Sequence, residues 1–470
     1  MEKKRGLKAF FGAQDMTVGN PTTVLLKFSL PLLLGNFVQQ LYNTVDAIVV
    51  GYYIGDNALA AVGAANPILN LLLSLFMGVA TGAGIVVAQY FGAKDRKMLS
   101  ASVGNILFLT IVTSVFVSVV GVAAAHPFLV LLQTPDSILS DASAYLVIFM
   151  AGFLGCAFYN MGSGILRGLG DSVMPLIYLI VCCGVNIVLD IAFVAGFKMG
   201  VAGASLATVI AQMISAVLCM VRLARMRDVL DVNLRLLRPE KNLCWRVIRI
   251  GMPAGLTQAV FSCAALVVQS LTNTFGEAVI AANTVIMRVD GFAMMPNFSF
   301  GNAMTTYVGQ NIGAGEHKRV HESARYGLTI ALITCGILVF CLLFLGEYLM
   351  RAFTSTEVVI DLGVRMLRLL AVGYMAVAVT QVLSGIMRGA GDTVTPMVIS
   401  IVTTVVVRVP IAYLLAALTK SEASPAGAPE SLFISMLISW VLGAVLSSIF
   451  YARGKWKTKF RLEEKPASET

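Results

Sequence analysis

The chain has 470 residues, of which 58% are hydrophobic and only 13% are charged. Soluble domains carry roughly 25% charged residues, so this composition excludes a soluble globular protein. A formal net charge of +9 would suit nucleic-acid binding, but Lys and Arg gather in alternate polar connections, as membrane topology requires. The pattern therefore predicts a polytopic membrane protein without a nucleic-acid partner.

Apolar stretches long enough to cross a bilayer as helices, which takes about 20 residues, recur along the whole chain. Transmembrane β-barrels are excluded because their strands would be about 10 residues long and would alternate in polarity. We therefore expect an all-α polytopic membrane protein with twelve transmembrane helices. Their cores are expected at 22–50, 58–90, 99–123, 141–165, 173–196, 200–221, 248–274, 278–309, 325–346, 361–386, 395–418 and 431–452.

The polar connections indicate how the chain is oriented. Basic residues are dense in the N-terminal tail, in the segment 222–249 and in the C-terminal tail. Because Lys and Arg stay on the cytoplasmic side of a membrane, both termini are expected in the cytoplasm. The basic N-terminus without a small-residue cleavage site is interpreted as a cytoplasmic end and not as a signal peptide.

Cysteine and histidine patterns indicate no cofactor chemistry. None of the eight Cys belongs to a CxxC pair, and the three His (126, 317 and 321) are expected in loops. We therefore expect no disulfide framework, no zinc site and no cofactor. An intramembrane hydrolase, which would need catalytic His or paired groups inside a span, is disfavoured, and the chain is not expected to be an enzyme.

The two halves of the sequence resemble each other. Three blocks recur at one nearly constant offset: "SLPLLLGNFVQQ" with "GMPAGLTQAVFS", "AQYFGAKDRK" with "GQNIGAGEHK", and "GILRGLGDSVMP" with "GIMRGAGDTVTP", which begin at 29 and 251, 88 and 309, and 164 and 385. Each half holds six spans, so the copies are parallel and related by a pseudo-two-fold along the membrane normal. The sequence predicts lobes at 1–221 and 248–470, a cytoplasmic linker at 222–247, and a central cleft, which is transporter architecture.

Acids inside apolar spans need a reason, because a mid-membrane charge costs about 2.5–3.5 kcal/mol on insertion scales. Counting 1.5 Å per residue from the outer ends of the spans puts Asp46 and Asp190 at a similar depth. Thr208 lies near that depth, and Asn186 shares a helix face with Asp190. We expect these four side chains to meet in the N-terminal lobe.

Two adjacent carboxylates in a low dielectric need a proton or a bound cation, and oxygen ligands suit a hard cation such as Na⁺. The alternative is a structural hydrogen bond from each Asp to backbone or Asn. The positions equivalent to Asp46 and Asp190 in the second half are apolar, so the cation site belongs to the first lobe alone.

Other polar residues are candidates for the substrate cleft. A stripe on the first span carries Asn36, Gln39 and Asn43 on the face of Asp46, with Tyr42 beside it, and Met287 and Asp290 lie in the eighth span. Flexible Met side chains adapt to varied ligands. Asp290 could also form a structural pair with Arg408, which we favour over a substrate contact; Arg288 points elsewhere.

At the level of motifs, "LYNTVDAIVVG", "NIVLD", the twin "RGxGD" turns, "MPNFSFGNAMTTYVGQNIGAG" and Pro253 together resemble the multidrug and toxic compound extrusion (MATE) family. The resemblance covers essentially the whole chain. It implies twelve helices in two lobes that open as a V, and export of cationic, amphipathic compounds driven by H⁺ or Na⁺.

The single acid in "YNTVD" and the absence of an acid in the seventh span resemble the DinF-like branch. That resemblance implies a cation site at Asp46, Asn186, Asp190 and Thr208, and bending of the first span at Pro31. We expect a monomeric antiporter for small cationic or amphipathic substrates. The alternative is a flippase for lipid-linked precursors from the same superfamily.

Overall fold

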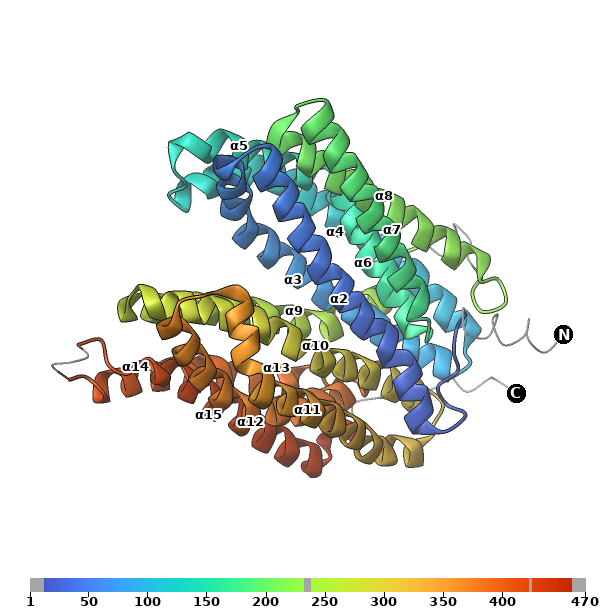
Figure 1. Cartoon of the computed structure of the whole chain (residues 1–470). Coiled ribbons are helices and arrows are strands. Elements are labelled where there is room, and N and C mark those ends of the chain that lie inside the picture. Colours follow the sequence, from blue (N-terminus) through green and yellow to red (C-terminus); the bar gives the residue numbers. More distant parts are fainter. Residues whose placement is uncertain (1–11, 232–237, 422–424, 459–470) are drawn as a thin grey trace, which may run out of the picture. The chain divides into compact units, whose positions relative to one another are not determined.

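The computed structural model describes residues 12–231, 238–421 and 425–458 (Figure 1). The basic tails and part of the linker, on which the expected orientation depends, lie outside these residues. Among the described residues, eleven helices are long and apolar enough to span a membrane, or twelve if the bent pair α5 and α6 is one span. Each expected core falls in one of these helices or in that pair, so the all-α prediction with twelve spans is confirmed.

The first repeat forms six spans. They are α2 (Pro21–Tyr53), α3 (Asp56–Gly92), α4 (Arg96–Leu131), α5 (Asp136–Ala151) with α6 (Phe153–Gly168), α7 (Val173–Asp190) with η1 (Ile191–Gly196), and α8 (Gly200–Arg225). The bend of 52° between α5 and α6 falls at Gly152. A Cβ there would lie 2.2 Å from Cγ1 of Val209, so only glycine lets α8 pack against this bend.

The second repeat has the same order of spans. They are α9 (Lys241–Thr272) with η3 (Asn273–Phe275), α10 (Glu277–Gly313), α11 (His317–Phe353), α12 (Glu357–Gly389), α13 (Val394–Ile401) with η4 (Val402–Arg408) and α14 (Val409–Leu418), and α15 (Glu430–Arg453), followed by η5 (Lys455–Thr458). The expectation that all three His lie in loops is wrong. His126 lies in α4, and His317 and His321 lie in α11, because these helices run beyond their apolar cores.

The twin "RGxGD" turns are tight reversals, as expected. Gly170 and Gly391 have φ of 83° and 90°, a left-handed conformation that glycine adopts without strain. The Asp that follows each glycine caps the next helix: Asp171 accepts from the backbone N–H of Met174 at 3.0 Å, and Asp392 from that of Thr395 at 3.3 Å. Each turn thus joins two spans with few residues.

The chain divides into two compact units. Unit 1 comprises Met1–Asp15 and Leu34–Gly255, and unit 2 comprises Met16–Leu33 and Leu256–Thr470. The borders fall inside α2 and α9 and not in the segment 222–247, whose role as the boundary between lobes stays a prediction. Each unit therefore contains the beginning of the first helix of the other repeat.

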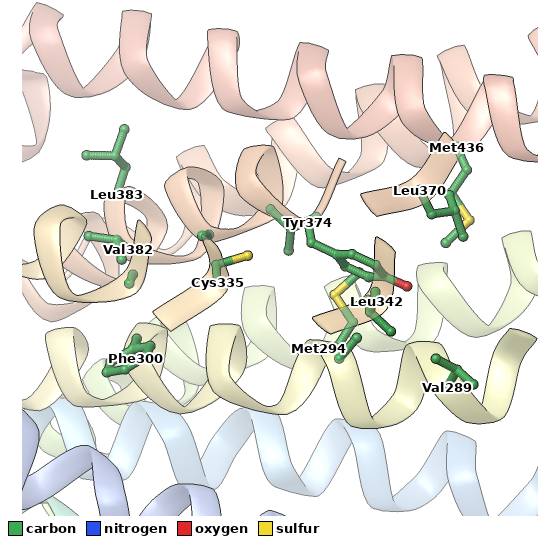
Figure 2. Packing of buried hydrophobic residues seen from close by; sticks show 14 of the residues in the cluster. Val289, Met294, Phe300, Cys335, Leu342, Leu370, Tyr374, Val382, Leu383 and Met436 are labelled. Carbon is green, nitrogen blue, oxygen red and sulfur yellow. The ribbon is translucent and has the colours of Figure 1, made fainter. Parts of the chain in front are cut away.

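Both units have their own hydrophobic core. The core of unit 2 gathers residues of α10, α11, α12 and α15, among them Met294, Leu342, Tyr374 and Met436 (Figure 2). Its largest fully buried side chains include Phe28 of α2. The core of unit 1 draws on α3 to α8 and on the first half of α9. Apolar side chains that would otherwise face lipid are thereby packed inside each unit.

Candidate functional site

Four side chains named from the sequence come together inside unit 1. Asp46 projects from α2, Asn186 and Asp190 from α7, and Thr208 from α8. Asn186 and Asp190 are fully buried, and Thr208 is 8% exposed. The carboxyl groups of Asp46 and Asp190 lie within hydrogen-bonding reach of each other. The meeting of these residues was expected from the depth of Asp46, Asp190 and Thr208 and from the helix face that Asn186 shares with Asp190.

Asn186 links the acidic pair to α8. In the amide orientation that satisfies both ends, its nitrogen donates to Asp190 Oδ2 at 2.9 Å, and its oxygen accepts from the Thr208 backbone N–H at 3.2 Å. The Thr208 hydroxyl donates to the carbonyl of Ala204 at 3.1 Å. The amide thereby holds one carboxyl oxygen in place and leaves the other open.

One oxygen of each carboxyl group lacks a partner. Oδ1 of Asp46 and Oδ1 of Asp190 are both buried and accept no hydrogen bond. Buried polar atoms are nearly always paired, so these two oxygens call for a shared proton, a cation or water. Two adjacent carboxylates cannot both remain ionised without such a partner. The arrangement can therefore hold and release one positive charge.

Two tyrosines complete the surroundings of the pair. The Tyr42 side chain lies next to Thr208, and Tyr145 of α5 lies close enough to both carboxyl groups to interact with them electrostatically. Ser205 donates to the backbone carbonyl of Tyr145 at 2.8 Å. Sequence reasoning missed Tyr145, because nothing in its apolar surroundings distinguishes it from a packing residue.

The helix changes type immediately after the site. Asp190 is the last residue of α7, and the π-helical segment η1 follows directly. Its wider turn is seen in the hydrogen bond of 2.8 Å from the N–H of Phe197 to the carbonyl of Ala192. π-Helical turns are rare and occur often at functional sites. The chain immediately beyond Asp190 therefore follows a wider path than an α-helix would give it.

The remaining candidates are less enclosed. Gln39 donates to Asn43 at 3.4 Å along α2, where Asn43 is exposed and Asn36 is half-buried. Met287 on α10 is 43% exposed. Pro31 lies inside α2 and is buried in unit 2. The contribution of these residues to a substrate cleft, and bending at Pro31, stay predictions.

Asp290 has a different partner from the one expected. Its Oδ1 accepts a hydrogen bond of 2.9 Å from the hydroxyl of Tyr374, whose ring lies 5.4 Å from that of Trp440, centroid to centroid. Arg408 is near enough to interact electrostatically with Asp290, but no ion pair between the two is formed in the described residues. The nearby tyrosine, and not the arginine, holds the carboxyl group.

Comparisons with known proteins extend these observations. The MatE family model matches twice, at residues 31–192 and 253–414, which confirms the internal duplication. The chain is 30% identical over 84% of its length to "Probable multidrug resistance protein YoeA" of Bacillus subtilis (strain 168), covering 87% of that protein. It is 29% identical over 96% of its length to "Probable multidrug resistance protein YpnP" of the same organism, covering all of it.

A solved structure has the same fold. It is described as "Outward-facing conformation of a multidrug resistance MATE family transporter of the MOP superfamily" and superposes with a TM-score of 0.87 at 24% identity, covering 95% of this chain and 98% of that one. The family model spans most of the chain in both repeats, and the relatives it resembles are drug-resistance transporters and not enzymes. The chain therefore belongs to the MATE family of multidrug export transporters.

Proposed function

We propose that this protein is a cation-coupled antiporter of the DinF-like branch, which exports organic cations and amphipathic drugs by alternating access. The coupling ion is H⁺ or Na⁺, and the protein acts as a monomer in the inner membrane of a bacterium, with both termini in the cytoplasm. No cofactor is required, because the electrochemical gradient supplies the free energy.

The observation that carries this proposal is the contact between Asp46 and Asp190 inside unit 1. Each contributes one buried, unpartnered oxygen, and a low-dielectric site with such oxygens favours uptake of a positive charge. Ion binding can drive transport only if it favours one conformation over another. Because Asp46 lies on α2 while Asp190 lies on α7, a proton or cation shared by the two carboxyl groups links two helices.

The choice between proton and sodium depends on the ligand set. Among the described residues, no three His, Cys, Asp or Glu side chains form a group that could hold a metal ion. Two carboxyl groups, an amide and a hydroxyl provide the oxygen atoms that Na⁺ prefers. The same two carboxyl groups can share one proton, so both ions fit this site chemically.

The test is transport in proteoliposomes that contain the purified protein and a fluorescent organic cation. A pH gradient and a Na⁺ gradient are imposed separately, each with the membrane potential clamped. We expect drug movement against its gradient with one of the two ions, accompanied by counterflow of that ion. Equal transport with both gradients collapsed, or none with either gradient, would rule out the proposed antiport.

A further inference from the structure

The repeated segments "AQYFGAKDRK" and "GQNIGAGEHK" have no role in the cation site. Their second residues, Gln89 and Gln310, are equivalent and both fully buried. They lie at the ends of α3 and α10, and each is next to a further polar residue, Tyr90 or Asn311. A buried amide at the same place in two repeats requires a specific partner.

In unit 1, that partner is the beginning of α9. Arg246 donates to the Tyr90 hydroxyl at 2.7 Å and to Gln89 Oε1 at 3.0 Å. Five residues further along, Gly251 packs so closely on α3 that a Cβ on Gly82 would lie 2.5 Å from the Gly251 nitrogen. The start of the second repeat is thus fixed to unit 1 by a charged side chain and by backbone contact.

In unit 2, the partner is the segment that precedes α2. Gln310 Oε1 accepts from the backbone N–H of Met16 at 2.8 Å, and Asn311 donates to the Met16 carbonyl at 3.3 Å. Arg319 donates to the carbonyls of Met16 and Gly19 at 3.2 and 3.0 Å. Met16 itself is fully buried in the core of unit 2.

The two arrangements are equivalent in register. The exchanged segment of unit 2 ends at Leu33, and the exchanged segment of unit 1 ends at Gly255. These two positions coincide when residue 29 is aligned with residue 251. Pro31 and Pro253 align two residues before these borders. The duplication has therefore preserved an exchange of helix beginnings. The position of the contacting arginine differs, because Arg246 belongs to the exchanged segment in unit 1 and Arg319 belongs to the receiving unit in unit 2.

We infer that the two repeated segments are clamps, each of which binds the exchanged beginning of the other repeat and keeps it with the receiving unit throughout transport. Arg246 and Arg319 are positioning residues in this device. Only the statement that the clamps stay closed throughout transport rests on the proposed alternating-access function. The clamps themselves are tested by a measurement that needs no transport.

Hydrogen exchange of the peptide containing residues 15–20 tests the clamp of unit 2. Arg319→Gln removes both carbonyl contacts, and Lys318→Gln removes the neighbouring exposed charge as a matched control. We expect exchange at Met16 to become at least tenfold faster in Arg319→Gln and unchanged in Lys318→Gln. Equal protection in both variants and the unmodified protein would overturn the clamp, whatever the protein transports.

A crosslink tests whether the clamp stays closed. Met16→Cys and Gln310→Cys are combined with Cys263→Ser and Cys341→Ser, which remove the two exposed native thiols. Oxidation joins the two new cysteines in a disulfide, and reductant returns them to free thiols. We expect the oxidised protein to transport at least as fast as the same protein reduced, because the bond replaces the lost hydrogen bond. Transport that falls to background on oxidation and returns with reductant would show that the segment must detach.

If the unmodified protein shows no coupled transport, the proposed function fails, and the exchange measurement still decides the clamp. If coupled transport is present but exchange is insensitive to Arg319, the clamp fails and the antiport stands. The two failures are therefore distinguishable.

Discussion

At the scale of residues, the proposed ion coupling depends on the acidic pair of Asp46 and Asp190. Asp46→Asn and Asp190→Asn each remove one ionisable group while keeping nearly the same volume, so the helices can still pack. We expect drug export in vesicles to fall to background in both variants, because one carboxyl group alone no longer shares a charge with a second. Asp141→Asn, at an exposed position of α5, should export normally. Full coupled export by either site variant would remove the pair from the mechanism.

Asp171, outside the membrane-spanning segments, makes a separate prediction about stability. Its side chain is 1% exposed and pairs with Arg222 at 3.3 Å. Burial raises the pKa of this carboxyl above its ordinary value, against the opposing effects of the Met174 N–H and Arg222. The folded state therefore binds more protons than the unfolded state from about pH 3.9 upward to the raised value.

In that window the free energy of unfolding contributed by Asp171 falls as the pH rises, by at most about 1.4 kcal/mol per pH unit. Asp171→Asn should lose this slope, whereas Asp228→Asn, at an exposed position, should retain it. Denaturation in detergent micelles across the window measures both. An unchanged slope in Asp171→Asn would contradict the assignment.

Part of the candidate site could be predicted from the sequence. Asp46, Asp190 and Thr208 could be grouped because each is polar at a similar depth in an apolar span, and Asn186 because it shares a helix face with Asp190. Tyr145 could not, since a tyrosine in a span is as often packing as function. The partner of Asp290 was missed because helical spacing fixes neighbours within one helix and does not reveal that α12 brings Tyr374 to α10.

At the scale of elements, close helix packing depends on glycine. On α3, a Cβ at Gly78 would lie 2.1 Å from the backbone nitrogen of Gly255, and one at Gly82 would lie 2.5 Å from that of Gly251. Backbone cannot yield as a flexible side chain does, and overpacking of this kind typically costs 1–3 kcal/mol or more. The crossing of α3 and α9 in unit 1 therefore admits no larger residue without a shift.

Gly82→Leu should accordingly lower the melting temperature of the detergent-solubilised protein and the amount inserted in the membrane. Gly184→Ala on α7 is the matched control, because a Cβ there meets nothing within 4 Å. In that helix alanine is the better helix former by about 1 kcal/mol, so stability should be unchanged or higher. Equal melting temperatures for Gly82→Leu and the unmodified protein would refute the close approach.

Apolar length and polar connections were enough to place all twelve spans. The π-helical segments η1 and η4 could not be predicted in this way, because a single wide turn leaves no separate period in an apolar run. The bend at Gly152 was also missed, because the sequence does not reveal that Val209 of α8 packs against this glycine.

At the scale of the molecule, the sequence repeat predicted two halves but not the exchange of segments between units. Equivalence of sequence identifies related helices, whereas membership of a unit depends on contacts that a repeat does not contain. Residues 16–33 precede or begin the first span, yet they complete the core of unit 2. The beginning of α9 likewise completes unit 1, although it belongs to the second repeat.

Cutting the chain within residues 232–237 tests this exchange directly. The N-terminal fragment then lacks the segment of α9 that covers the glycine face of α3, and the C-terminal fragment lacks Met16, Leu25 and Phe28 from its core. We expect each fragment alone to be degraded or to elute as aggregate. Co-expressed fragments should associate in the membrane, co-purify and restore drug resistance, because each completes the unit of the other. As a control, adding residues 238–255 to the N-terminal fragment should stabilise it alone. A bare N-terminal fragment as stable as this extended one would mean that unit 1 does not need the exchanged helix.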